Sequence, residues 1–139
     1  MAERFSSLFT GVYQRLIAAI LLIVSFFTVA KPDQVTLRVV SASAESITVE
    51  FTNETGKTVS PEQRFLLEVK TGNGCETVPF TEGFAWNDIA RICLPRETGE
   101  TTVDALRCFG KPLEAGDYRY TMYYACSGTA HSVSVEFGI

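Results

Sequence analysis

The stretch from Leu113 to Tyr124 constrains the fold more than any other part of the sequence, because it predicts a tight corner followed by a strand. Large side chains occupy alternate positions of that strand: Tyr118, Tyr120, Met122 and Tyr124. Successive side chains of a β-strand point to opposite faces, so these four share one face and the residues between them share the other. A strand with such a face needs a second apolar layer to cover it, which predicts two packed sheets.

The rest of the chain beyond Lys31 shows the same period of two. Apolar and polar residues alternate, or short apolar runs occur, over residues 34–39, 46–52, 64–70, 75–80, 89–94, 101–106 and 132–137. Turn residues separate these segments, and Pro79 predicts that the segment it belongs to lies at a sheet edge. We expect no amphipathic helix after Ala30. The pattern predicts an all-β antiparallel sandwich of about seven or eight strands.

An apolar, charge-free run from Leu16 to Ala30 precedes the strands, and Arg4 and Arg15 come before it. As a helix it would cover only about 22 Å, less than the ~30 Å core of a bilayer. The small residues at 28–30 suit a signal peptidase, so residues 1–30 are interpreted as a cleaved secretory signal. An uncleaved N-terminal membrane anchor is the alternative. Both interpretations place residues 31–139, one domain, outside the cytoplasm.

The residues before the aromatic strand match the pattern of a tyrosine corner, Leu113-x-x-Gly116-x-Tyr118. In this device the tyrosine hydroxyl at the start of a strand donates to a backbone carbonyl a few residues upstream. We expect Gly116 to permit the turn and Leu113 to fill the core beneath it. The three residues are therefore predicted to be structural.

Four segments in order carry a resemblance to a known family: residues 49–56 with Asn53, residues 65–68, residues 94–98 with Pro95, and residues 113–119. The series resembles the bacterial immunoglobulin-like domain of exported, mostly uncharacterised proteins of Gram-positive bacteria. The resemblance covers about residues 35–137 and implies an immunoglobulin-like sandwich outside the cytoplasm, with no catalytic residues. The chain departs from that family at Cys75, where a tryptophan is frequent, and at Arg96, where a glycine usually follows the proline.

All four cysteines follow the apolar run, which predicts two disulfides in an exported domain. They are Cys75, Cys93, Cys108 and Cys126. If the chain reverses at each turn, Cys75 and Cys108 meet at one end of the sandwich and Cys93 and Cys126 at the other. We favour these two pairs. The alternative pairing joins Cys75 to Cys93 and Cys108 to Cys126.

Several function classes have little support in the sequence. The formal charge is −4 and no basic stripe is present, which argues against a nucleic-acid partner. The cysteines lack Cys-x-x-Cys spacing and His131 is the only histidine, so we expect no metal and no cofactor. His131 has no neighbouring nucleophile and orienting carboxylate in the sequence, and we therefore predict a non-catalytic protein.

The function predicted from these features is that of an exported binding module or structural spacer at the cell surface. Its partner would be a protein or another component of the cell envelope, and residues 16–30 would provide any membrane contact. Tyr123, Arg119, Trp86 and Phe84 are the candidate interaction surface, with Tyr123 expected near Trp86 or Phe80. The alternative is an inhibitor or immunity-type protein that blocks an enzyme with the loop formed by residues 81–88.

Overall fold

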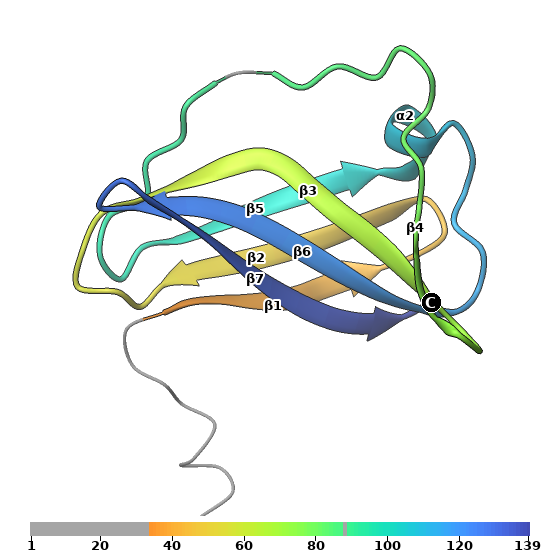
Figure 1. Cartoon of the computed structure of the whole chain (residues 1–139), viewed down its shortest axis with the longest axis horizontal. Coiled ribbons are helices and arrows are strands. Elements are labelled where there is room, and N and C mark those ends of the chain that lie inside the picture. Colours follow the sequence, from red (N-terminus) through yellow and green to blue (C-terminus); the bar gives the residue numbers. More distant parts are fainter. Residues whose placement is uncertain (1–33, 88) are drawn as a thin grey trace, which may run out of the picture. The chain divides into compact units, whose positions relative to one another are not determined.

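Two antiparallel sheets packed face to face form the domain (Figure 1). The computed structural model describes residues 34–87 and 89–139, so the predicted leader and Asp88 lie outside the described residues. One sheet has the strand order β1-β2-β5 and the other β4-β3-β6-β7. The strands are β1 (Val35–Ala42), β2 (Ser46–Asn53), β3 (Val59–Thr71), β4 (Gly74–Thr77), β5 (Thr98–Asp104), β6 (Asp117–Cys126) and β7 (Thr129–Gly138). The predicted all-β sandwich is confirmed.

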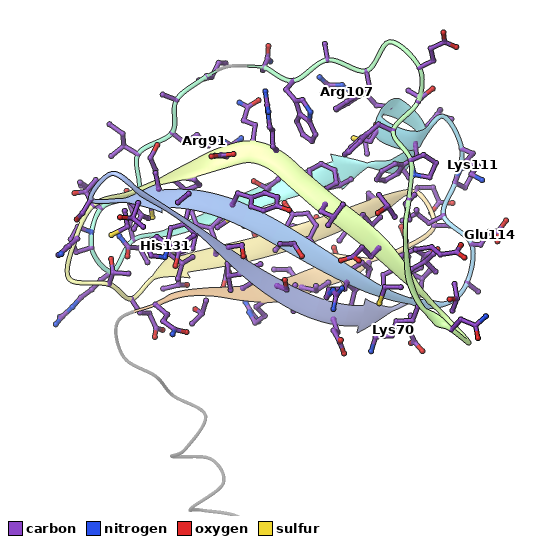
Figure 2. All side chains as sticks on the ribbon, in the orientation of Figure 1. Lys70, Arg91, Arg107, Lys111, Glu114 and His131 are labelled. Carbon is purple, nitrogen blue, oxygen red and sulfur yellow. The ribbon has the colours of Figure 1, made fainter. Side chains whose placement is uncertain are left out.

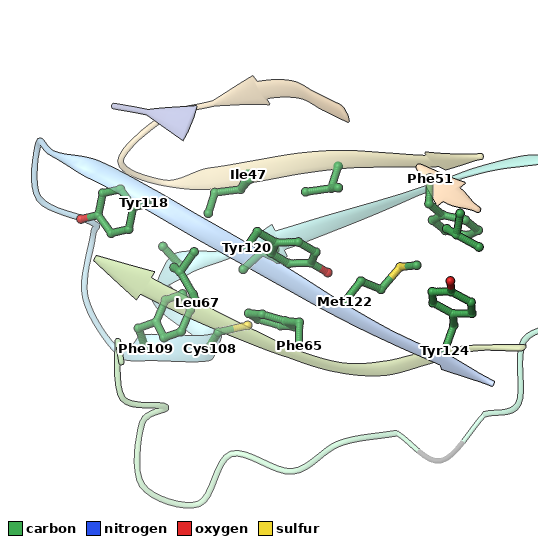
Figure 3. Close-up of a cluster of buried hydrophobic side chains, with 14 of the residues drawn as sticks. Ile47, Phe51, Phe65, Leu67, Cys108, Phe109, Tyr118, Tyr120, Met122 and Tyr124 are labelled. Atoms are coloured by element: carbon green, nitrogen blue, oxygen red, sulfur yellow. The ribbon is translucent and has the colours of Figure 1, made fainter. Parts of the chain in front are cut away.

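The core lies between the sheets and is built from the alternate positions expected from the sequence (Figure 3). On β6 the four large side chains are all buried, with exposed fractions of 2–8%. Ile47, Val49 and Phe51 of β2 face them from the other sheet, and Leu67 of β3 lies beside Tyr120 in the same sheet. Burial of a side chain of this size stabilises the fold by about 1.5–3 kcal/mol, so this layer supplies much of the stability.

Two hairpins of the larger sheet have the turn chemistry that the sequence predicts. β6 and β7 are joined by Ser127 and Gly128, both with positive φ (51° and 76°). Two central residues with positive φ match the right-handed twist of the flanking strands, which fixes the register of the hairpin. The β3–β4 hairpin turns through residues 72 and 73, between the paired Thr71 and Gly74.

Two expectations for the middle of the chain are wrong. Residues 89–94 form no strand, and only Cys93 makes an isolated bridge, to Val59. Residues 98–104 form β5, and a short helix, α2 (Ala105–Phe109), follows where the strand was expected to continue. Asp104 caps this helix by accepting a hydrogen bond from the backbone N–H of Arg107 at 3.2 Å. The strand therefore ends at Asp104, because this residue caps the helix that follows.

α2 ends at Gly110, whose φ of 75° is the left-handed conformation favoured at a helix C-terminus. The helix directs Cys108 and Phe109 into the core and leaves Leu106 exposed. Within the described residues, no helix is long and apolar enough to cross a bilayer.

Candidate functional site

The predicted corner has the hydrogen bond that defines a tyrosine corner. The Tyr118 hydroxyl donates to the Glu114 carbonyl at 2.6 Å, and the Tyr118 ring stacks on Phe137 with centroids 5.7 Å apart. Leu113 is buried beneath it. Gly116 has no left-handed backbone, and a Cβ there would meet its neighbours at 3.8 Å or more. Gly116 thus permits the turn, but neither the backbone nor the space around it requires a glycine there.

A second polar device joins β2 to the segment before β5. Asn53 is fully buried, and its side-chain amide donates to the carbonyls of Lys57 at 2.7 Å and Cys93 at 3.1 Å. Its side-chain oxygen accepts from the backbone N–H of Thr55 at 3.0 Å. Every polar atom of the side chain thus has a partner, as burial requires. Asn53 is a structural residue that holds three chain segments together.

Arg96 stands where the resembled family usually has a glycine, and its backbone explains that preference. Its φ is 65°, in the left-handed region, and its N–H donates to the Asn53 carbonyl at 2.7 Å. A residue with a Cβ pays about 1–2 kcal/mol for this conformation, whereas glycine adopts it freely.

We expect Arg96→Gly to raise the free energy of unfolding by about 0.5 kcal/mol, because relief of backbone strain slightly exceeds the greater entropy of glycine in the unfolded chain. The backbone hydrogen bond is retained in this variant. Urea unfolding of wild type, Arg96→Gly and the control Arg96→Ala, which keeps the Cβ, measures the effect. A glycine variant no more stable than the alanine variant would contradict the strain argument.

The four cysteines are unbonded thiols in the structure, so neither predicted pairing is present. Cys75 is exposed and pairs with Lys70 of β3, on the outer face of the larger sheet. Cys108 is buried on the inner side. A bond between Cys75 and Cys108 would have to pass through the sheet, which is why this pairing is wrong.

Cys93 and Cys126 lie at the same end of the sandwich, as predicted, but they are separated by a strand. Val59 pairs with Cys126 on one side and with Cys93 on the other. Because two strand spacings separate them, the Cα atoms of Cys93 and Cys126 are about 9.5 Å apart. A disulfide needs about 4.4–6.8 Å. Burial raises the pKa of the Cys93 and Cys108 thiols, which keeps both protonated and weakly reactive at neutral pH.

The longest connection in the described part of the chain is the β4–β5 loop, residues 78–97, which arches over the edge of the sandwich between β3 and β5 (Figure 1). Contacts between aromatic side chains hold the first half of this loop in place. Phe65 of β3 meets Phe80 and Trp86 edge to face, each at 5.3 Å between centroids. Phe84 lies 5.0 Å from both of these loop rings. We call Phe65, Phe80, Phe84, Trp86 and Phe109 the aromatic cluster.

Between this loop and the two sheets lies a cavity of about 230 Å³. Its walls come from β2, β3, β5, β6, α2 and the loop. Phe65, Trp86 and Met122 supply apolar surface, and Arg91 and Arg107 lie beside it (Figure 2). Arg91 donates to the Thr101 hydroxyl at 2.9 Å, which connects the loop to β5 across the cavity.

Tyr120 also lines the cavity, and its hydroxyl has no hydrogen-bond partner among the described residues. Its side chain is 2% exposed, and every fully enclosed side-chain nitrogen or oxygen of those residues does have a partner. The hydroxyl therefore borders the cavity. Burial raises the pKa of Tyr120 well above its usual value, although the Arg91 charge acts in the opposite direction.

This pKa shift predicts a loss of stability at alkaline pH. Above about pH 10 an unfolded tyrosine releases its proton while folded Tyr120 keeps it, so the free energy of unfolding falls by about 1.4 kcal/mol per pH unit for this group. Chemical denaturation between pH 9 and 11.5 is expected to show a decline that is steeper by about this amount in wild type than in Tyr120→Phe. Equal slopes in the two proteins would contradict the burial of the phenol.

The predicted interaction surface is divided between two sides of the larger sheet. Arg119 and Tyr123 alternate with the buried residues of β6 and lie on its outer face, whereas Phe84 and Trp86 pack into the aromatic cluster. The expectation that Tyr123 lies beside Trp86 or Phe80 is wrong, because strand alternation puts it on the opposite face. Arg119 is occupied by Glu68, with its Nη2 2.9 Å from the carboxylate.

His131 lies at the rim, as expected from its place near the start of β7. It is exposed and stacks on Tyr124 with centroids 5.3 Å apart, in a hollow that also borders Cys126 and Lys57. No side chain of the described residues makes a hydrogen bond or ion pair with His131. Nor do those residues include any group of three or more His, Cys, Asp or Glu side chains that could hold a metal ion. We place no candidate site in this hollow.

Comparison with known protein families defines the class. The family model described as bacterial Ig-like domain matches residues 34–137. The chain therefore belongs to the bacterial Ig-like domain family, and the resemblance in the sequence is confirmed. A comparison with curated proteins gave no match. Domains of this family are generally non-catalytic and typically extracellular.

Proposed function

We propose that the protein is a non-catalytic, extracytoplasmic binding module that contacts a protein partner in the cell envelope through the β4–β5 loop. The observation that supports this most directly is the exposure of Ile89, Ile92 and Leu94, at 64%, 72% and 55%. These three side chains, which we call the loop crest, lie within six residues of one loop. Exposed apolar side chains that occur together are typical of an interaction site.

The way the loop is held also supports this proposal. Connections of more than about 12–15 residues without secondary structure are uncommon in compact domains and are usually functional. Here the aromatic cluster fixes the start of the loop, and the two backbone hydrogen bonds between Cys93 and Val59, at 2.9 and 3.0 Å, fix its later part. A rigid scaffold thus presents the loop crest, which lowers the entropy cost of binding.

An inhibitor is the second candidate function. Residues 81–87 include Phe84 and Trp86, whose rings pack together and hold the loop in one conformation. A loop held in this way can enter an enzyme's active site with little loss of entropy. Under this hypothesis the partner is one enzyme, bound with one-to-one stoichiometry.

The test uses a photo-crosslinking amino acid at position 92 in the chain expressed in its native host. We expect one dominant crosslinked partner, and at least a tenfold lower yield when Leu94→Asp is added. The same crosslinker at Arg38, on the outer face of the other sheet, serves as the control. Equal, diffuse crosslinking at both positions would contradict the binding role and favour a spacer.

The identity of the partner separates the two candidates. An enzyme that is recovered in stoichiometric amount and loses turnover on binding favours the inhibitor. A non-enzymatic envelope partner favours the binding module. Any turnover by the protein itself that His131→Ala abolishes would overturn the non-catalytic proposal.

A further inference from the structure

The cavity beneath the β4–β5 loop has the chemistry of a small-molecule site, and this inference goes beyond partner binding by the loop crest. We propose that the cavity binds a small aromatic carboxylate, with the ring among Phe65, Trp86 and Met122 and the carboxylate between the Tyr120 hydroxyl and the Arg91 guanidinium.

The volume fits a ligand with one ring. Apolar cavities of about 150 Å³ hold a benzene molecule. The cavity here is about 230 Å³, which leaves room for one polar substituent beside the ring. Drug-sized ligands occupy about 300–1,000 Å³, so larger molecules are too big for it.

The walls favour an aromatic ring over an aliphatic chain. Phe65 and Trp86 pack edge to face with an interplanar angle of 90°, and both line the cavity, so a guest meets aromatic surface there. Aromatic rings prefer offset and T-shaped contacts with other rings, which favours an aromatic guest. The Met122 sulfur, a soft and polarizable neighbour for a ring, adds to this preference.

The polar groups favour an anion. The three ion pairs among the described residues use Arg38, Lys70 and Arg119, and therefore neither Arg91 nor Arg107. Among residues 34–87 and 89–139, the acceptor of the Arg91 guanidinium is a neutral hydroxyl, that of Thr101. A carboxylate would be a stronger acceptor for it, since hydrogen bonds with an ionised partner on each side are the strong ones.

Tyr120 supplies the second donor. Its hydroxyl is without a protein partner, although the side chain is 98% buried, counting from its 2% exposed fraction. Because this hydroxyl borders the cavity, it can donate a hydrogen bond to a ligand there. Arg91 and Tyr120 line the same cavity, so the ligand carboxylate is placed between these two groups.

Carboxylates that line the same cavity would repel the ligand carboxylate, and they therefore limit where in the cavity it can lie. Glu62 and Asp104 both line the cavity. Asp104 is engaged as the cap of α2, where it accepts the Arg107 N–H at 3.2 Å. The ligand carboxylate is therefore placed at Tyr120 and Arg91, away from the α2 cap.

The experiment is a titration of the purified chain with benzoate at pH 7, followed by tryptophan fluorescence. Trp86 is the only tryptophan and lines the cavity, so the signal reports on the site directly. We expect a saturable change with benzoate. Benzyl alcohol, which lacks the charge, and acetate, which lacks the ring, should each bind at least tenfold more weakly.

Two variants and two matched controls assign the contacts. Arg91→Gln is expected to weaken benzoate binding tenfold or more, and Tyr120→Phe about tenfold, which is the range for a hydrogen bond to a charged group. Arg38→Gln and Tyr123→Phe, both outside the cavity, should bind as wild type does. Because Arg91 is exposed, its variant tests the site even if Tyr120→Phe folds poorly.

A rise in the midpoint of thermal unfolding with benzoate provides a second measurement, since a ligand that binds only the folded state stabilises it. Three results would overturn the proposal: no saturable change with benzoate, equal affinity for benzyl alcohol, or wild-type affinity in both Arg91→Gln and Tyr120→Phe. Leu94→Asp, which is expected to reduce partner crosslinking from position 92, should leave benzoate affinity unchanged, so the two proposals can fail separately.

Discussion

Replacing Phe65 with alanine is expected to lower the free energy of unfolding by about 3–5 kcal/mol, the usual cost of emptying a buried phenylalanine site. The ring is 7% exposed and contacts four others, with Tyr120 stacked against it at 5.2 Å between centroids. The variant loses the burial of the ring and its edge-to-face contacts with the β4–β5 loop. Urea denaturation of the purified chain measures the change.

The same substitution has a local consequence that a general loss of stability would not produce. Without Phe65 the start of the loop loses its main contact with β3, so the loop opens at lower free-energy cost than the sheets do. Trypsin is therefore expected to cut after Arg91 faster in Phe65→Ala than in wild type, under conditions in which both are folded. Val40→Ala, at a 44% exposed position, is the control and should change stability by less than about 0.5 kcal/mol.

A stability loss below about 1.5 kcal/mol, together with an unchanged rate of cleavage after Arg91, would show that Phe65 does not hold the loop. A large loss of stability with an unchanged cleavage rate would assign the ring to the core alone. The two measurements thus separate the packing contribution from the contribution to loop order.

Asn53→Ala is expected to lower the free energy of unfolding by about 2–4 kcal/mol, because it removes the hydrogen bonds of a fully buried side chain and leaves the Thr55 N–H without its acceptor. The Thr55 N–H loses its bond to the Asn53 oxygen, and the Cys93 carbonyl loses the bond from the Asn53 amide and keeps the one from the Val59 N–H. Both groups belong to segments that other contacts keep in place, so they cannot turn to water freely. Equilibrium unfolding in urea tests this expectation.

Asn73→Ala, in the exposed β3–β4 turn, is the matched control and should change stability by less than about 1 kcal/mol. Asn53→Asp tests the donor separately. It keeps the acceptor for Thr55 but loses the two amide donations, and it adds a buried charge, so it should be no more stable than Asn53→Ala. If Asn53→Ala were as stable as Asn73→Ala, the structural role assigned to Asn53 would be wrong.

On the larger sheet, strand periodicity predicts which face a side chain lies on but not which loop residue it contacts. Alternation on β6 correctly divides Tyr120 and Met122 from Arg119 and Tyr123. The expected contact of Tyr123 with Trp86 needed the path of a loop, and a loop has no period from which to predict it. The partners that Trp86 has in the structure, Phe65 and Phe80, come from segments whose meeting is decided by packing.

The cysteines show a second limit of the same kind. Counting strand reversals places Cys93 and Cys126 at one end of the sandwich, which is where they lie, on either side of Val59. The count assumed a strand at residues 89–94 and a strand through Leu106. A lone bridge and the helix α2 replace these two elements, and α2 carries Cys108 into the core. Whether two thiols can form a disulfide depends on the distance between them to within a few ångströms. A count of strand reversals does not give that distance.

The sequence alone determined the class of fold, the buried face of β6 and the tyrosine corner at Tyr118, because these depend on neighbours within a few residues. Only the tertiary structure decided the roles of Asn53, the cavity beside Tyr120 and the exposure of the loop crest. Each of these depends on which distant segments come together, as when Asn53 meets Cys93 forty residues later. Side-chain alternation is a local property of the backbone, whereas a cavity or a shared hydrogen bond exists only when the sheets have packed.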